Sequence, residues 1–323
     1  MKRLWYGGAA TVVLAGAAYG WAGDALAPLL PAEEPVRVLF VGDLMLDRNV
    51  ARAATTVGAR GLFATSTLEL FADADLRVGN LEGTITTNAS IAQRNNKILR
   101  FTFDPALARD VLQLLRFDAV SLANNHALDF GEFGYDDTVA ALSALGIKTF
   151  GQPYNDTGKR STMLEVRGKQ LCFVGYHSLF VPDRTNVVAD VQSLRPRCWR
   201  VVVVAHWGEE YETLSNDAQQ SQAHAFIDAG ADLVIGAHPH VVQEVEVYQG
   251  KAIFYSLGNF VFDQNFSWET MHGLGVQVDL YEEKTRFTLI PLTIANQHAS
   301  VTVGADRERT LEQAGSVAQF ILP

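Results

Sequence analysis

Cysteine is scarce in this sequence, with only Cys172 and Cys198 among 323 residues. Two cysteines are too few for the disulfide framework that holds many small secreted domains together, so the fold must depend on a hydrophobic core. Cys172 lies in an apolar run, and Cys198 lies in the polar stretch 195–200. A bridge between them can form outside the cytoplasm, but the sequence does not give their separation in space.

Positive charge is also in short supply, because 26 Lys and Arg stand against 36 Asp and Glu, for a net charge of −10. A dedicated nucleic-acid-binding protein usually carries a basic face, and nothing here indicates one. A polyanionic partner would need local positive charge from a bound metal or from a few arginines. The sequence contains no Walker-type phosphate loop, and no dinucleotide-binding glycine motif follows the first predicted strand.

The N-terminal residues predict a membrane segment. Lys2 and Arg3 precede the uncharged residues 4–23, which are long enough to cross a bilayer once. We predict a membrane anchor or signal segment at 1–23, a proline-containing linker at 24–35 and a folded domain at 36–323. An uncleaved anchor keeps Lys2 and Arg3 in the cytoplasm and the bulk of the chain outside. Cleavage after the linker's Ala-Leu-Ala is the alternative, and would give a secreted or periplasmic protein.

Short apolar runs alternate with helical patterns in the predicted domain. The runs typical of buried strands are 36–41, 76–79, 118–123, 201–205 and 232–235. The helical patterns are 105–115, 135–145 and 218–229. Two hairpins turn at 167–169 and 249–251, and residues 274–294 alternate like antiparallel strand. This order predicts an α/β fold with a mixed sheet or a pair of sheets.

Polar side chains able to bind metal follow each of these strands. They are Asp43, Asn80, Glu82, Asn125, His126, His206, His238 and His240. Ligands of α/β folds sit just beyond the carboxyl ends of the strands, so five segments should deliver these side chains to one rim. Carboxylates, an amide oxygen and neutral imidazoles suit Mn, Zn or Fe. The sequence therefore predicts a divalent metal site at this rim.

Each motif also has a structural explanation when it is taken alone. Asp43 can cap the following helix, and Glu82 can be a solvated loop residue. Asn125 fits a turn, and His206 and the His-x-His pair can make local hydrogen bonds. Three imidazoles at strand ends, among only eight histidines in the chain, favour metal binding.

Two further residues are predicted to act in catalysis. His126 can donate a proton to a leaving group, unless it is a loop histidine with a local partner. Arg48 can hold a phosphate or carboxylate through two parallel hydrogen bonds, or it can pair with Asp47 or Asp129 and do nothing more. Ser256 has no His and Asp partners in a suitable order, which argues against a serine hydrolase.

Six motifs in this order resemble the bacterial capsule-synthesis family of CapA type, which is associated with poly-γ-glutamate. They are residues 42–45, 80–82, 124–126 with 129, 131 and 134, 206–208 with 210–211, 236–240 with 243, and 255–260. That family resembles calcineurin-like metallophosphoesterases in fold. The resemblance implies a four-layer α-β-β-α sandwich with mixed sheets and a two-metal centre. By the same resemblance, the ligands are Asp43, Glu82, Asn125, His206, His238 and His240.

Two departures from the phosphoesterase pattern affect the metal count. Met45 stands where that pattern has a histidine, and Glu82 stands in for its bridging aspartate. One metal position has therefore lost a ligand, which leaves one or two ions. Two functions remain open. One is a metal-dependent hydrolase acting on a phosphoester or amide bond of an acidic surface polymer. The other is a non-catalytic polymer-binding or assembly component that works with other capsule-synthesis membrane proteins.

Overall fold

The computed structural model describes residues 34–95 and 97–323. The predicted anchor or signal segment, 1–23, and most of the predicted linker lie outside the described residues. Within the described part of the chain, no helix is long and apolar enough to cross a membrane. Residues 34–323 form one unit by their internal contacts.

The first sheet is mixed and, within the described residues, has nine strands. Its strand order is β16-β15-β14-β1-β2-β5-β6, with β13 beside the end of β1 and β17 beside β15. Strands β1, β2, β5 and β6 run parallel, and β14 to β16 are antiparallel. The strands are β1 (Val36–Leu44), β2 (Leu76–Leu81), β5 (Ala119–Ser121), β6 (Lys148–Phe150), β13 (Asn259–Val261), β14 (His272–Leu280), β15 (Thr285–Ala295), β16 (His298–Val301) and β17 (Gln319–Leu322).

The second sheet has six strands in the part of the chain that the structure describes, in the order β11-β12-β10-β9-β8-β7. Its central strands are parallel, and the two edge strands close hairpins. The strands are β7 (Ser161–Val166), β8 (Lys169–His177), β9 (Arg200–His206), β10 (Leu233–Ala237), β11 (Val245–Tyr248) and β12 (Lys251–Phe254). A small two-stranded ladder joins β3 (Thr84–Ile85) to β4 (Thr102–Phe103).

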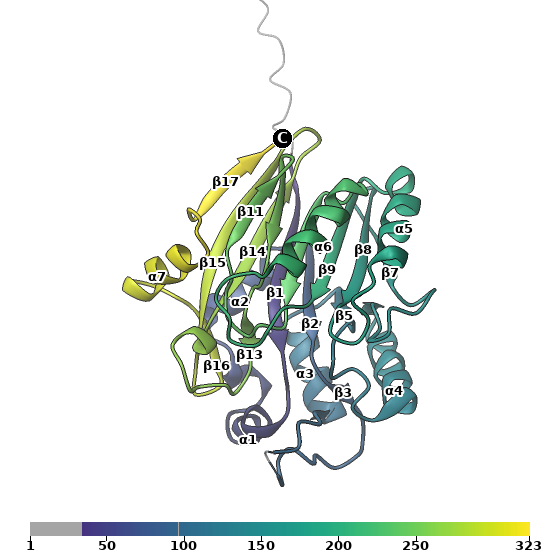
Figure 1. Cartoon of the computed structure of the whole chain (residues 1–323). Helices are drawn as coiled ribbons and strands as arrows, with labels where there is room; N and C mark the ends of the chain where they lie inside the picture. The colour runs from purple at the N-terminus through teal and green to yellow at the C-terminus, as the bar shows by residue number, and fades with distance from the viewer. Residues whose placement is uncertain (1–33, 96) are drawn as a thin grey trace, which may run out of the picture. The chain divides into compact units, whose positions relative to one another are not determined.

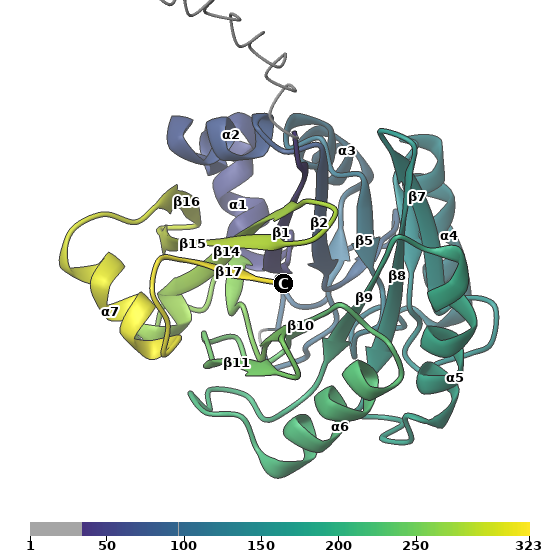
Figure 2. The same ribbon diagram turned by 90° about the horizontal axis from the view of Figure 1, so that it is seen from above.

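Helices cover the outer faces of both sheets, as Figures 1 and 2 show. Helices α1 to α4 pack on the first sheet, α5 and α6 pack on the second, and α7 lies beside β15. The helices are α1 (Arg48–Val57), α2 (Thr65–Ala72), α3 (Pro105–Leu114), α4 (Gly131–Ala144), α5 (Thr185–Leu194), α6 (Asp217–Asp228) and α7 (Ala305–Gln313). The predicted four-layer α-β-β-α sandwich with mixed sheets is confirmed.

Three hydrophobic clusters separate the four layers. The central cluster joins the inner faces of the two sheets, for example Phe40 and Val276 of the first with Phe173 of the second. The outer clusters join each sheet to its helices. Strands β1, β2, β9 and β10 are therefore buried on both faces, which explains why they read as continuous apolar runs.

The predicted elements are present with small differences at their ends, and several further helices were not predicted. Helix α1 is one of these, although Asp47 accepts a hydrogen bond from the backbone N–H of Arg48 at its start. Helices α2, α5 and α7 also went unpredicted. Both predicted hairpin turns occur, with Arg167 and Gln249 in the left-handed region before a glycine. That backbone conformation matches the twist of a two-residue hairpin.

Cys172 and Cys198 form a buried disulfide, with their Cα atoms 5.9 Å apart. The bridge links β8 to the segment that leads into β9, inside the outer cluster of the second sheet. The sequence left open whether the two cysteines pair. They do, because β8 and β9 are adjacent parallel strands, and the sequence alone does not reveal that adjacency.

Candidate metal centre

Four parallel strands from the two sheets end at one rim and carry polar side chains there. In the first sheet Asp43 lies opposite Asn80, and in the second His206 lies opposite Ala237, just before the His-x-His loop. Ligand atoms of Asp43, Glu82 and His206 all lie within 4.8 Å of one another. The two sheets therefore contribute to one buried group.

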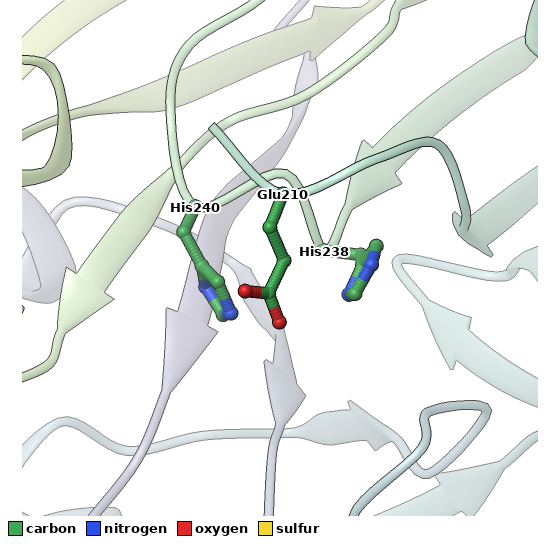
Figure 3. Close-up of side chains that lie close together, drawn as sticks. All are labelled: Glu210, His238 and His240. Atoms are coloured by element: carbon green, nitrogen blue, oxygen red, sulfur yellow. The ribbon is translucent and has the colours of Figure 1, made fainter. Parts of the chain in front are cut away.

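A second group lies beside the first and contains a residue that the sequence did not single out as a ligand. Ligand atoms of Glu210, His238 and His240 also lie within 4.8 Å of one another. Figure 3 shows the Glu210 carboxylate between the two imidazoles. Glu210 comes from the loop after β9, and the histidines come from the loop after β10.

His240 connects the two groups. Its Nδ1 lies 3.2 Å from Asp43 Oδ2 and 3.0 Å from Asn259 Oδ1. Asn259 donates through its Nδ2 to Thr270 O, so its Oδ1 accepts and Nδ1 of His240 carries the proton. The Nε2 lone pair of His240 then faces Glu82 Oε1 at 3.6 Å. Two acceptors face each other, which requires a proton or a cation between them.

Unpartnered buried atoms show that a divalent ion fits this cluster. Glu82 Oε1 and His238 Nδ1 are buried and have no hydrogen-bond partner among the described residues. Burial lowers the pKa of His238 to about 3, so its imidazole is neutral and offers a lone pair. Burial and the charge of Asp43 raise the pKa of Glu82 well above its usual range. A cation would supply the partner that these atoms lack.

The pKa of Asp43 is shifted in the opposite direction to that of Glu82. Burial acts to raise its pKa, but the hydrogen bonds that His240 and Asn80 donate to its carboxylate outweigh burial, so the pKa lies below its ordinary value. Asp43 Oδ2 also accepts from the backbone N–H of His238 at 3.3 Å. Asp43 is thus held ionised next to three imidazoles, as a metal ligand must be.

His206 presents its Nδ1 to the centre. Its Nε2 lies 2.9 Å from Asn125 Oδ1, and an amide oxygen can only accept, so Nε2 carries the proton. Burial lowers the pKa of His206 well below its usual range, which keeps the ring neutral. Asn125 therefore contributes to the centre by fixing the tautomer of His206.

Asn80 lies between the two carboxylates and is fixed in orientation by a chain of hydrogen bonds. Asn124 accepts from the backbone N–H of His126 and donates to Asn80 Oδ1 at 2.9 Å. Asn80 Nδ2 must then point into the centre, where it lies 2.8 Å from Asp43 Oδ1 and 3.2 Å from Glu82 Oε2. This neutral donor holds both carboxylates in place without adding charge.

Met45 is buried and turned toward the backbone of the same loop. Its Sδ accepts from the N–H of Asp47 at 3.0 Å. Asp47 itself is fully buried and accepts from Ser90, Gln93 and the backbone of Thr102. The position after the first strand therefore supplies only one metal-capable side chain, Asp43.

The two residues predicted to be catalytic both line a cleft beside the centre. His126 Nδ1 lies 2.9 Å from Asp129 Oδ2, and the ring packs on Phe101. Arg48 forms an ion pair with Asp263, so neither of the partners considered in the sequence, Asp47 or Asp129, holds its guanidinium.

Several residues at this rim have a strained backbone. Four of the non-glycine residues with positive φ are found here: Arg48 at 50°, Tyr211 at 69°, His238 at 98° and His240 at 59°. Such conformations cost of order 1–3 kcal/mol each and persist where the surrounding structure imposes them, often at functional sites. The strain marks the His-x-His loop as shaped for more than its own stability.

Sequence reasoning missed two residues of the rim in addition to Glu210. His177 ends β8 directly opposite His206, donates to Pro153 O through Nδ1, and has a buried Nε2 without a partner. Burial lowers its pKa to about 4. Asn259 was given no role of its own within the 255–260 motif, but it fixes the tautomer of His240. For His177, its place at the end of an apolar run was an available signal.

A family model described as bacterial capsule synthesis protein PGA_cap matches residues 37–264. This chain belongs to that bacterial capsule synthesis family. The PGA biosynthesis protein CapA of Bacillus subtilis is 32% identical over 296 residues, covering 86% of this chain and 77% of that protein. The capsule biosynthesis protein CapA of Bacillus anthracis is 30% identical over 325 residues, covering 94% of this chain and 78% of that protein.

Similar solved structures are more distant. A hypothetical protein from Thermus thermophilus has a TM-score of 0.49 at 19% identity, over 82% of this chain and 96% of its own. A phosphatase from Mycoplasma pneumoniae has a TM-score of 0.43 at 12% identity, over 87% of this chain and 97% of its own. At these values the function has to be inferred from the site itself and from the capsule family.

Proposed function

We propose that this protein acts outside the cytoplasm, held by an N-terminal anchor, in the synthesis or export of an acidic capsule polymer of poly-γ-glutamate type. We further propose that its rim is a metal-dependent hydrolase site that cleaves an amide or phosphoester bond of that polymer or its precursor. The observation that carries the proposal is Glu82 Oε1, which is buried without a hydrogen-bond partner among the described residues and lies 3.6 Å from the lone pair of His240 Nε2.

A divalent ion such as Mn, Zn or Fe, bound by Asp43, Glu82, His206, His238 and His240, would polarise the scissile group and make water a nucleophile near neutral pH. The protein's own residues do the remaining work. Asn80 fixes the two carboxylates, and Asn125 and Asn259 fix the tautomers of two imidazoles. Such fixed partners keep ligands in the geometry that binding requires.

His126 is placed to move a proton. Asp129 accepts from its Nδ1, so a protonated ring donates to the substrate through Nε2–H. In the hydrolysis, water oxygen bonds to the reacting carbon or phosphorus, the bond to the leaving group breaks, and the leaving group takes the His126 proton. The proton lost by water returns the imidazole to its starting state.

The buried disulfide supports the proposed location. Cys172 and Cys198 are both buried and paired, and structural disulfides of this kind are typical of oxidising, extracytoplasmic compartments. The same location is where a capsule polymer is assembled on the cell surface.

The test compares His126→Ala with a matched histidine variant. Full-length protein is loaded with Mn, and hydrolysis of γ-linked glutamate oligomers and of an aryl phosphate is measured beside metal content. His126→Ala should lose about 100-fold or more in rate while retaining the ion. His298→Ala, in β16, should behave as wild type.

Two outcomes would contradict the proposed hydrolase activity. One is equal hydrolysis by His126→Ala and wild type, and the other is no hydrolysis by metal-loaded wild type of either substrate. The second outcome, together with normal capsule production by cells carrying His126→Ala, would favour a polymer-binding or assembly component.

A further inference from the structure

A cleft of about 620 Å³ opens directly from the metal centre. Its inner end is lined by His126, Glu210 and His240, and its outer part is lined by Arg48, Arg52 and Arg94. A molecule that reached the centre through this cleft and filled it would therefore lie against these arginines. The cleft is far larger than a single phosphate or carboxylate group.

The arginines of the outer cleft differ in how their charge is compensated. Arg48 is neutralised by Asp263 and lies over the rings of Phe101 and Phe262. Arg52 donates only to neutral oxygens, Asn49 Oδ1 and Gln93 O, both at 2.7 Å.

Arg94 and its neighbours Lys97 and Arg100 also lack carboxylate partners. Among the ion pairs formed within the described residues, none includes Arg52, Arg94, Lys97 or Arg100. Two of these four cations, Arg52 and Arg94, line the cleft, so their positive charge faces it without a carboxylate partner, although the whole chain has a net charge of −10. The carboxylates that share the cleft, Glu210 and Asp263, are already engaged by the centre and by Arg48.

A further hollow of about 380 Å³ adjoins the cleft and shares Gln93 and Arg94 with it. Its one carboxylate, Asp104, caps α3 by accepting from the N–H groups of Ala106 and Leu107. Arg94 thus stands where two hollows meet. This arrangement suits an extended chain better than a compact anion.

Apolar side chains line the cleft together with the cations. Leu99 and Phe266 line it and are 49% and 64% exposed, which leaves them open to contact with aliphatic carbon. Guanidinium groups match the geometry of carboxylates, and apolar neighbours contact the methylene groups that carry them.

We infer that the Arg52–Arg94 cleft is a subsite for a linear polycarboxylate, whose carboxylates on short aliphatic arms lie on these arginines while one linkage reaches the metal centre. The inference rests on the proposed function, because it describes how the same substrate is held. It assigns to Arg52 and Arg94 the binding of the chain on one side of the reacting bond.

Binding is tested with full-length, Mn-loaded protein and a fluorescent oligomer of γ-linked glutamate, by anisotropy at increasing salt. The variant Arg52→Gln/Arg94→Gln should bind about 100-fold more weakly, roughly tenfold for each charge-assisted contact, with a shallower salt dependence. The control Arg116→Gln/Arg197→Gln removes two other exposed arginines that form no ion pair, and should bind within about twofold of wild type.

Unchanged affinity in Arg52→Gln/Arg94→Gln, or an equal loss in the control, would overturn the inference. Tighter binding of a polyphosphate of equal charge would overturn the carboxylate assignment in favour of a phosphate polymer. Metal content and hydrolysis are measured in the same samples. Arginine-dependent binding without hydrolysis would support this subsite and contradict the proposed enzyme, so the two failures are distinguishable.

Discussion

The two ends of the same parallel strands differ in whether their polar side chains have partners. At the amino ends, Asp75, Asp118 and Asp232 each accept from the backbone N–H of the second residue of the neighbouring strand. Each also has a cation beside it, such as Arg77 for Asp118 and Arg195 for Asp232. These carboxylates are fully partnered and tie the strands together.

At the carboxyl ends, buried polar atoms lack partners and the backbone is strained. Glu82 Oε1, His238 Nδ1 and His177 Nε2 are buried without hydrogen bonds, and His238 has a φ of 98°. The same fold thus satisfies its polar groups at one end and leaves them open at the other. The contrast teaches that the unmet partners, rather than the residue types, mark the functional end.

The largest effect on metal binding should come from removing a negative charge at the carboxyl ends of the strands. Glu82→Gln should weaken binding of Mn about 1,000-fold, or about 4 kcal/mol, because the ion loses an anionic ligand. Isothermal titration with the fold checked by circular dichroism measures it. Affinity within about threefold of wild type would show that Glu82 is not a ligand.

The protonation of His177 should lower the free energy of unfolding by about 3 kcal/mol as the pH falls. Burial lowers its folded pKa from 6.5 to about 4, so its stabilising contribution is complete above pH 6.5 and is lost as pH falls toward 4. Metal-free His177→Gln should therefore lose less stability than wild type over that interval in urea unfolding. His298→Gln serves as the control, and parallel curves for all three proteins would contradict the account.

A substitution at the amino ends of the strands should lower the free energy of unfolding by about 2 kcal/mol. Asp232→Ala leaves the N–H of Val201 and the guanidinium of Arg195 without their partner, so unfolding should require less denaturant. Its metal affinity should remain that of wild type. A large loss of metal binding with the fold intact would break the distinction between the two ends.

The smallest effect should have the opposite sign. His238→Gly relieves the positive φ and removes a buried unpartnered nitrogen, so the metal-free protein should gain about 1 kcal/mol in stability. The same change should weaken metal binding. A variant that is clearly less stable than wild type without metal would show that His238 has a structural role.

The positions of the predicted residues show how far the strand pattern carries. Asp43, His206 and His238 lie at the rim as expected, because buried parallel strands read as apolar runs and the residue after such a run lies at the rim. His177 follows the same rule, but its strand was interpreted as one arm of a hairpin, so the rule was not applied to it.

Other contacts could not be read from local patterns. Arg48 pairs with Asp263, which is 215 residues away, and His240 depends on Asn259 on a strand beside β1. Such pairings depend on which strands become neighbours. The same reason kept the Cys172–Cys198 bridge undecided.

The most direct test of the metal centre is the metal content of full-length protein, measured by mass spectrometry after incubation with Mn, Zn or Fe and removal of excess ion. Wild type and Asp232→Ala should retain near-stoichiometric metal, and Asp43→Ala/His238→Ala of confirmed fold should retain almost none. If folded wild type is as metal-free as the double variant with all three ions, the rim at the carboxyl ends of the strands is not a metal centre.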